Sequence, residues 1–205
     1  MIKVENVDVY GFEAAIRGMR NPLNSWDKSD SAFMGNVGFQ SYIGENDLDL
    51  MRGLYKAGTE HRKYLRMITV TMDIVAPLYW WKEFDTYKVG TVANSCSTMH
   101  KIAEKEFTMG DFSHEHLQEP MLEILKHTIH GLNDSRDAFL SSKDKLMWWQ
   151  MIQLLPSSYN QRRTVQFNYE NAVTMIKQRT GHKLDEWSEF VEVLKKLPYV
   201  KEITE

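Results

Sequence analysis

The sequence predicts an α+β fold in which early strands form an antiparallel or mixed sheet that packs with a mainly helical second half. Two stretches in the first half, residues 2–9 and 66–75, carry β-branched residues and alternate in hydrophobicity. In the second half the apolar residues recur at helical spacing. Strands that come early and helices that come late are typical of α+β rather than alternating α/β proteins. No internal repeat or linker-like segment interrupts the 205 residues, so we expect a single domain over 1–205.

In the first half, the two predicted strands end at residues that break them. Residues 2–9 form a strand that stops at Gly11. Residues 66–75 (RMITVTMDIV) form the second strand, which ends at Ala76-Pro77 because proline has no amide hydrogen for the sheet. The other predicted elements are a helix over 12–19, a loop over 21–44 with room for one helical turn, and a helix over 47–63 with Asn46 as its candidate cap.

The densest aromatic stretch of the chain, residues 78–84 (LYWWKEF), predicts a short helix. It is read either as core or interface, or as a surface on which a flat cofactor stacks. Residues 85–100 are rich in small and hydroxyl side chains and predict a loop or a bent helix. Apolar spacing predicts four further helices: 117–132, which ends at a Gly-Leu-Asn-Asp turn, then 135–155, 164–179 and 184–197.

The composition argues against several classes of protein. The formal net charge of −3 does not favour a constitutive binder of nucleic acid or of membrane surfaces. No apolar run approaches the roughly 20 residues that span a bilayer. The first residues show neither the basic nor the apolar region of a secretory signal. A single cysteine, Cys96, excludes an internal disulfide. We therefore expect a cytoplasmic protein that contacts neither membrane nor nucleic acid.

The residue types that carry chemistry leave several alternatives open. His127 and His130 share a helix face at i, i+3, but no carboxylate-histidine set recurs at ligand spacing, so no metal site is predicted. Cys96 lies in a run of small polar residues and is read as a small buried thiol or as a nucleophile. One set of basic residues is either solvated or forms an anion-binding group: Arg162, Arg163, Arg179, Lys82 and Lys88.

Two stretches carry a more specific order of residues. In the first, Glu60-His61 leads into the strand of 66–75, Ala76-Pro77 follows, and the run TYKVGTVANSCST covers 86–98. This order resembles the flavin-dependent thymidylate synthase family. In that family a Glu-His pair, a strand, Ala-Pro and a helix ending in Arg-Gln-Trp precede the signature Arg-His-Arg-x-x-Ser-x-Asn-x-x-Ser-x-Arg.

The second stretch matches the same family more closely. Leu155-Pro156, Tyr159, Asn168 and Arg179 follow one another, and Arg179 lies eleven residues beyond Asn168, as in the family. Eleven residues of helix are about three turns, which places both side chains on roughly one face. The two stretches together cover somewhat under half of the chain.

The resemblance implies a homo-oligomer that binds FAD and a pyrimidine nucleotide such as dUMP. It assigns to Arg179 contact with the pyrimidine and its polarisation for attack, which makes this residue both catalytic and substrate-binding. The residues that it assigns to the flavin are Asn168, His61, Lys88 and Thr91. The basic residues that would bind the nucleotide beside Arg179 are Lys82, Arg162 and Arg163.

The departures from the signature bear on activity more than on fold. Thr86 and Thr98 stand where the family has arginines, and Cys96 stands at the second Ser position. A hydroxyl in place of a guanidinium removes charge-assisted hydrogen bonds of about 1.5–3 kcal/mol each. Two functions remain open on this scaffold: a diverged enzyme, and a catalytically silent protein that binds or senses a nucleotide. A third interpretation, a structural or interaction protein, rests only on the surplus of aromatic residues and methionine.

For the enzyme, the resemblance implies a defined set of co-substrates. Reduced FAD would relay a one-carbon unit from methylenetetrahydrofolate to dUMP or a related pyrimidine nucleotide, and NADPH would reduce the flavin. The family builds each site from several chains, so a tetramer is expected. The surplus of aromatic residues and methionine agrees with this, because such residues are enriched at subunit interfaces.

Overall fold

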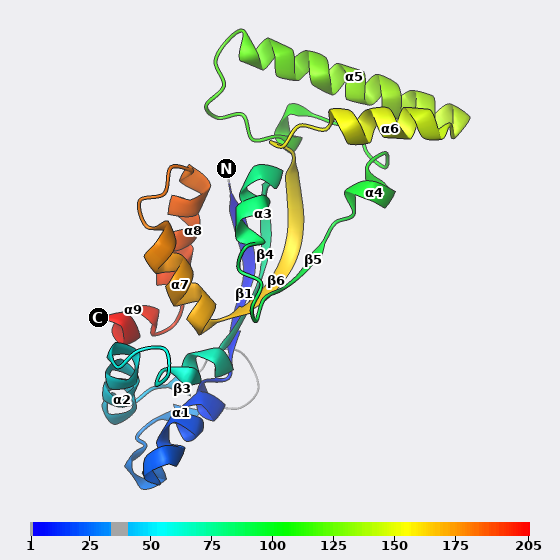
Figure 1. Ribbon diagram of the computed structural model, residues 1–205. Coiled ribbons are helices and arrows are strands. Elements are labelled where there is room, and N and C mark those ends of the chain that lie inside the picture. The colour runs from blue at the N-terminus through cyan, green and yellow to red at the C-terminus, as the bar shows by residue number, and fades with distance from the viewer. Residues whose placement is uncertain (1, 34–40) are drawn as a thin grey trace. The chain divides into compact units, whose positions relative to one another are not determined.

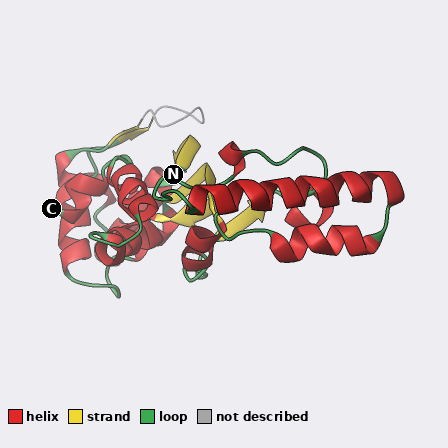
Figure 2. Cartoon of the chain, turned by 90° about the horizontal axis from the view of Figure 1, so that it is seen from above, coloured by secondary structure: helices red, strands yellow, loops and turns green. Residues whose placement is uncertain are grey.

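A computed structural model describes residues 2–33 and 41–205 of the chain. Its fold is α+β, as predicted (Figure 1; Figure 2). Four strands form an antiparallel sheet in the order β1-β4-β6-β5, and β2 pairs antiparallel with β3. The strands are β1 (Lys3–Tyr10), β2 (Ala32–Phe33), β3 (Ser41–Tyr42), β4 (Thr69–Pro77), β5 (Val92–Ser95) and β6 (Asn160–Asn168). The loop predicted over 21–44 lies partly outside the described residues.

The described α-helices follow the predicted pattern in most of the chain. The first strand, the helix that follows it and the aromatic helix are confirmed, each within two residues of the predicted bounds. The helices are α1 (Phe12–Arg20), α2 (Glu45–Lys56), α3 (Leu78–Phe84), α4 (Thr98–Lys101), α5 (Met121–Ser142), α6 (Lys145–Leu154), α7 (Tyr169–Arg179), α8 (Asp185–Lys195) and α9 (Val200–Thr204). Among the described residues no helix is both long and apolar enough to cross a bilayer.

Four of the described strands were not predicted from the sequence: β2 and β3, which fall in the loop predicted over 21–44, and β5 and β6. β5 lies within 85–100, and all four of its residues are exposed, so it lacks the alternation that marks a half-buried strand. β6 occupies the first residues of the helix predicted over 164–179. That helix begins at Tyr169, because the side-chain carbonyl of Asn168 accepts the backbone N–H of Asn171 at 3.0 Å and caps α7.

Several predicted helix bounds are also wrong. The helix predicted over 47–63 ends at Lys56, the one predicted over 117–132 begins at Met121, and the one predicted over 135–155 is interrupted at Lys143. α5 continues through the predicted turn after Leu132, because Asn133 is held inside it. The Asn133 side chain accepts from Phe107 N at 2.8 Å and donates to Phe107 O at 2.9 Å. α2 begins at Glu45 rather than after an Asn46 cap. The Asp30 carboxylate accepts the N–H groups of its first turn, including that of Asn46 at 3.0 Å.

The chain divides into two compact units. The first comprises the first residues of the chain with Ile74–Thr86 and Asn94–Arg163. The second comprises Val4–Asp73, Tyr87–Ala93 and Thr164–Glu205. Each unit buries its own aromatic and aliphatic side chains.

In the first unit, α5 and α6 lie side by side (Figure 1; Figure 2). Apolar residues of these two helices and of the segment 102–112 form a core: Ile102, Ala103, Phe107, Phe112, Leu125, Ile129, Leu132 and Met151. The aromatic helix α3 is buried as well, with the rings of Trp80 and Phe84 stacked at 5.2 Å. The core interpretation of this stretch is therefore confirmed, because Trp80, Trp81 and Phe84 are each at most 1% exposed.

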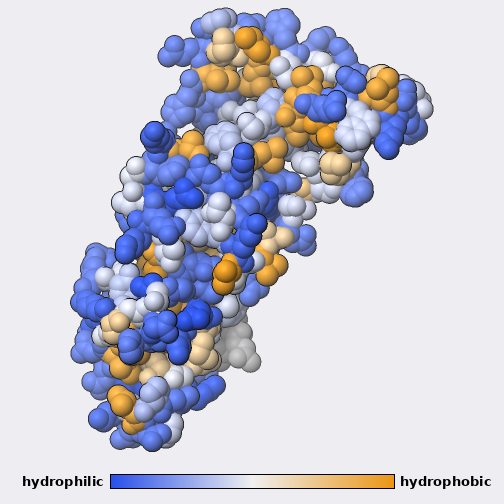
Figure 3. Space-filling model, in the orientation of Figure 1, coloured by the Kyte–Doolittle hydropathy of each residue, from blue (hydrophilic) through white to orange (hydrophobic). Residues whose placement is uncertain are grey.

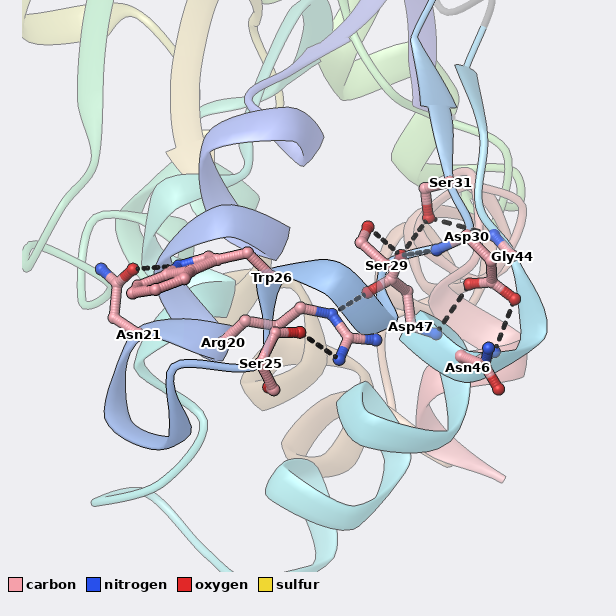
Figure 4. Close-up of polar contacts among 10 residues, drawn as sticks. All are labelled: Arg20, Asn21, Ser25, Trp26, Ser29, Asp30, Ser31, Gly44, Asn46 and Asp47. Atoms are coloured by element: carbon pink, nitrogen blue, oxygen red, sulfur yellow. Dashed lines mark hydrogen bonds and ion pairs between the residues drawn. The ribbon is translucent and has the colours of Figure 1, made fainter.

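The second unit contains a buried ion pair that joins α1 to α2 (Figure 4). Arg20 Nε donates to Asp47 Oδ1 at 2.6 Å, and the two side chains are 4% and 0% exposed. The other carboxylate oxygen of Asp47 accepts from the hydroxyls of Ser29 and Ser31 at 2.7 and 2.6 Å. Burial on its own would raise the pKa of Asp47, but these donors hold the pKa below its usual range.

Candidate functional site

The first unit contains a polar cavity of about 610 Å³. Its wall comes from the end of β5, α4, the loop after α4 and the start of β6. The side chains that matter chemically are a thiol, hydroxyls and cations: Cys96, Ser97, Thr98, Lys101, Tyr159 and Arg162. Three cations (Lys101, Lys105 and Arg162) and two carboxylates (Glu104 and Asp111) line the cavity, so its lining carries one net positive charge as well as several hydrogen-bond donors. This combination suits an anionic ligand.

Gln161 fixes the backbone that carries this wall. Its side-chain amide donates to Cys96 O at 2.8 Å, and Cys96 N donates to Arg162 O at 2.9 Å. Gln161 is buried, and Trp81 Nε1 donates to its carbonyl at 2.9 Å. The segment 96–98 is thus held at the edge of the cavity by β6 and by the aromatic helix.

Two lysines at the cavity have carboxylate partners. Lys105 binds Asp111, which also accepts from the N–H and the hydroxyl of Thr108 at 2.8 and 3.0 Å. Burial would raise the pKa of Asp111, but Lys105 and Thr108 outweigh it and hold the pKa below its usual range. Lys101 pairs with Glu104 one turn away, and both side chains are mostly exposed.

Tyr159 closes part of the cavity wall. Burial raises the pKa of its phenol, and the negative charge of Asp111 raises it further. The Tyr159 hydroxyl therefore stays protonated near neutral pH and keeps a hydrogen to donate.

In the second unit, the segment 87–91 lies along α7. At the start of the helix, Asn171 Nδ2 donates to Val89 O at 2.9 Å and to Thr91 Oγ1 at 2.8 Å. Gly90 has a φ of +73°, and a Cβ there would lie 2.6 Å from Asn168 Nδ2. A glycine is needed here because an L side chain would be strained and would strike the Asn168 amide.

At the other end of α7, Arg179 is surrounded by rings of its own unit. Its Nε donates to the Tyr87 hydroxyl at 2.9 Å, and its guanidinium carbon lies 4.5 Å from the centre of the Trp187 ring. A nitrogen of the same guanidinium lies 3.1 Å from His182 Nε2. Arg179 is thus half-buried and oriented, so it is not the exposed helix-end arginine that the sequence also allowed.

The structure brings some of the predicted site residues together. Asn168, Lys88 and Thr91 lie at the start of α7 or in the segment beside it, whereas Arg179 lies at the other end of the helix. Arg162 lines the cavity of the first unit.

The other predicted residues lie elsewhere. Arg163 makes an ion pair with Asp85 at 2.8 Å, and its guanidinium carbon lies 4.3 Å from the centre of the Trp81 ring. Lys82 and His61 are exposed, and neither is among the residues of the cavity.

Sequence reasoning missed three residues that shape these places: Lys101, Gln161 and Asn171. The sequence does contain a signal for Lys101. It lies three residues after Thr98, so on a helix both side chains project from the same side of a turn. The expectation of a buried Cys96 is wrong, since the thiol is exposed.

The two histidines considered for a metal have other neighbours. His127 Nδ1 lies 2.7 Å from Glu123 O, and His130 Nε2 lies 3.5 Å from Asp134. Within residues 2–33 and 41–205 no group of three or more histidine, cysteine, aspartate or glutamate side chains is placed to hold a metal ion.

Comparison of the whole chain with known proteins gives the fold. No protein-family model and no curated protein sequence matches this chain. This chain is similar to the crystal structure of flavin-dependent thymidylate synthase ThyX from Helicobacter pylori, complexed with FAD and dUMP. The match covers 97% of this chain and 98% of the ThyX chain, with a TM-score of 0.68. This chain has the ThyX fold.

The likeness to ThyX is one of structure far more than of sequence. The identity to the first ThyX structure is 16%. A second structure of Helicobacter pylori ThyX with FAD and dUMP gives a TM-score of 0.68 at 15% identity, over 98% of this chain and 96% of that one. At this level of identity, the function has to be argued from the residues of the site.

Proposed function

We propose that this chain binds FAD and a pyrimidine nucleotide such as dUMP on its ThyX-like scaffold, as a homotetramer. The observation that carries the proposal is the match over nearly the whole chain to ThyX structures complexed with both molecules. The second of the two sequence stretches supports it, because Asn168 and Arg179 bracket α7 at the spacing that the family resemblance requires.

The residues present fit the two ligands in their chemistry. At the start of α7 the donors are neutral apart from Lys88, namely the Asn168 amide and the Thr91 hydroxyl, which suits the carbonyl and hydroxyl groups of a flavin. At the cavity of the first unit the donors include cations, among them Lys101 and Arg162, which suits a phosphate group. Those neutral groups would hold the flavin, and the cations would hold phosphate.

Arg179 is the residue that we propose for the reaction itself. The Tyr87 hydroxyl and the Trp187 ring fix the direction of its guanidinium, so its N–H groups have a defined orientation. If these N–H groups donate hydrogen bonds to a pyrimidine carbonyl, they would stabilise the negative charge that develops on the ring during attack. The flavin, when bound, supplies the relay of a one-carbon unit from methylenetetrahydrofolate, and NADPH supplies its electrons.

Calorimetric titration tests the binding proposal. The protein is titrated with FAD, and the FAD-loaded protein is then titrated with dUMP. Saturable binding of both, with one of each per chain, is expected. Absence of FAD binding, with the fold intact by circular dichroism, would contradict the proposal.

A specific observation favours a second function, that of a catalytically silent nucleotide binder. Thr86 and Thr98 stand where the family resemblance expects arginines, and Arg163 makes an ion pair with Asp85 inside its own unit. Transfer of label from methylenetetrahydrofolate to dUMP under NADPH decides between the two. Labelled product supports the enzyme, whereas tight dUMP binding without product supports the silent binder.

A further inference from the structure

We propose that the cavity of the first unit is a phosphate-ester subsite, in which Lys101 and Arg162 bind the phosphate that the signature arginines do not. The inference rests on the proposed nucleotide-binding function and assigns part of its binding energy to residues outside the signature. Ser97 and Thr98 add hydroxyl donors from the same wall.

The position of Lys101 allows it to replace the missing guanidinium. Thr98 stands where the family resemblance expects the last signature arginine, and Lys101 follows three residues later on α4. Residues at i and i+3 project from the same side of a helical turn. Both residues line the cavity, so a positive charge is kept at this wall although the arginine is absent.

Arg162 reaches the same cavity from β6. Its carbonyl accepts Cys96 N at 2.9 Å, which fixes the backbone of the arginine beside segment 96–98. The buried Gln161 makes a second bond to the same place, from its amide to Cys96 O at 2.8 Å. The two cations are therefore carried by backbone segments that are tied to one another, as a preformed anion site requires.

The two lysines of the cavity differ in how strongly they are held. The Lys105 partner, Asp111, is 13% exposed and is fixed by Thr108 as well. In the Lys101–Glu104 pair both side chains are more than 60% exposed, and such i, i+3 surface pairs contribute little to stability. A phosphate carrying up to two negative charges competes well with Glu104, so Lys101 is the lysine that changes its partner on binding.

Phosphate esters reach this protein from two sources under the proposed function: the monoester of dUMP and the diphosphate of FAD. Both present the same oxygen acceptors to an ammonium and a guanidinium. The experiment therefore compares each ligand with its phosphate-free counterpart, dUMP with deoxyuridine and FAD with riboflavin.

The test is calorimetric titration of the full chain and three variants. Lys101→Gln removes the charge, Lys101→Arg restores it, and Lys126→Gln is the matched control. Lys126 forms an exposed i, i+3 pair with Glu123 on α5 and is not among the residues of the cavity. We expect Lys101→Gln to weaken binding of one phosphate-bearing ligand by about tenfold or more, without changing binding of its phosphate-free counterpart.

The ligand that loses affinity identifies the source of the phosphate, and recovery in Lys101→Arg assigns the effect to charge. Equal affinities of the parent and Lys101→Gln for both dUMP and FAD would overturn the subsite while leaving the proposed function standing. A parent protein that binds neither dUMP nor FAD would overturn the proposed function, and the subsite with it. Weakening by Lys126→Gln to the same extent would also overturn the subsite, because the effect would then be one of net charge.

Discussion

Arg179, the residue that we propose for the reaction, is held by rings from two distant parts of the chain. Its eleven-residue offset from Asn168 predicted its place on α7. The rings around it come from Tyr87, which lies far upstream, and from Trp187, which follows the turn at Gly181. Such contacts between distant parts of the chain are set by the fold and leave no periodic pattern in the sequence.

Arg179→Ala is expected to weaken dUMP binding by about 10- to 100-fold, the equivalent of losing a charge-assisted hydrogen bond of 1.5–3 kcal/mol. Calorimetry with dUMP measures the change. Lys177→Ala, which removes an exposed cation from the same helix, is the control and should bind as the parent does. Equal affinity of the parent and Arg179→Ala, with unchanged thermal unfolding, would assign Arg179 to the packing of α7 alone.

Asp47→Ala is expected to destabilise the second unit strongly. The substitution leaves the Arg20 guanidinium buried without its carboxylate, which typically costs about 3–5 kcal/mol of unfolding free energy. Urea unfolding measures this, and Asp27→Ala, an exposed carboxylate in the same region, should change little. A loss below about 0.5 kcal/mol would contradict the account of the buried pair.

The same carboxylate predicts a dependence of stability on pH. The folded state holds the pKa of Asp47 below its unfolded value, so its contribution is fully present above about pH 4 and is lost as the pH falls through the folded pKa. The difference in unfolding free energy between the parent and Asp47→Asn should therefore shrink as the pH falls below about 4. A difference that stays constant over this range would show that the Asp47 charge does not contribute.

At the scale of elements, the sequence predicted the strands and helices that have a clear hydrophobic or aromatic pattern within their own residues. β1, β4 and α3 have clear alternation or aromatic density, and they lie where predicted or within a few residues. β5 was missed because its side chains are all exposed, and β6 because its polar residues hide the alternation. The family spacing singled out Asn168 and Arg179, which lie at the two ends of α7. No sequence signal marked Gln161 as the anchor of segment 96–98.

Asn133→Ala tests why α5 runs without a break. The Asn133 side chain makes two hydrogen bonds with the backbone of Phe107, one with its N–H and one with its C=O. The substitution removes both of these hydrogen bonds. We expect a loss of about 1–3 kcal/mol in unfolding free energy. Asp134→Ala, on the same turn but exposed, is the control and should stay within about 0.5 kcal/mol of the parent.

At the scale of the whole molecule, the proposed tetramer agrees with the surface of the first unit. Figure 3 shows hydrophobic atoms among hydrophilic ones over α5 and α6. Exposed apolar side chains on these helices are Met121, Ile124, Leu140, Leu146, Trp149 and Leu154. Side chains of this kind gather at subunit interfaces more than on monomer surfaces.

Light scattering at micromolar concentration is expected to give the mass of four chains. Leu146→Glu places a charge on the apolar surface of α6 and should shift the mass to a smaller assembly. Gln150→Glu adds the same charge at another exposed position of the helix and should leave the mass unchanged. A monomeric parent would remove the tetramer and any active site shared between chains.

The absorption spectrum of the protein, purified after incubation with FAD and then exposed to NADPH without oxygen, tests the central claim most directly. The claim is that this ThyX-like scaffold holds a working flavin. The account predicts that the oxidised-flavin spectrum co-elutes with the protein, that it bleaches on addition of NADPH, and that dUMP perturbs it. A colourless protein that retains no FAD, although its fold is intact, would contradict the account.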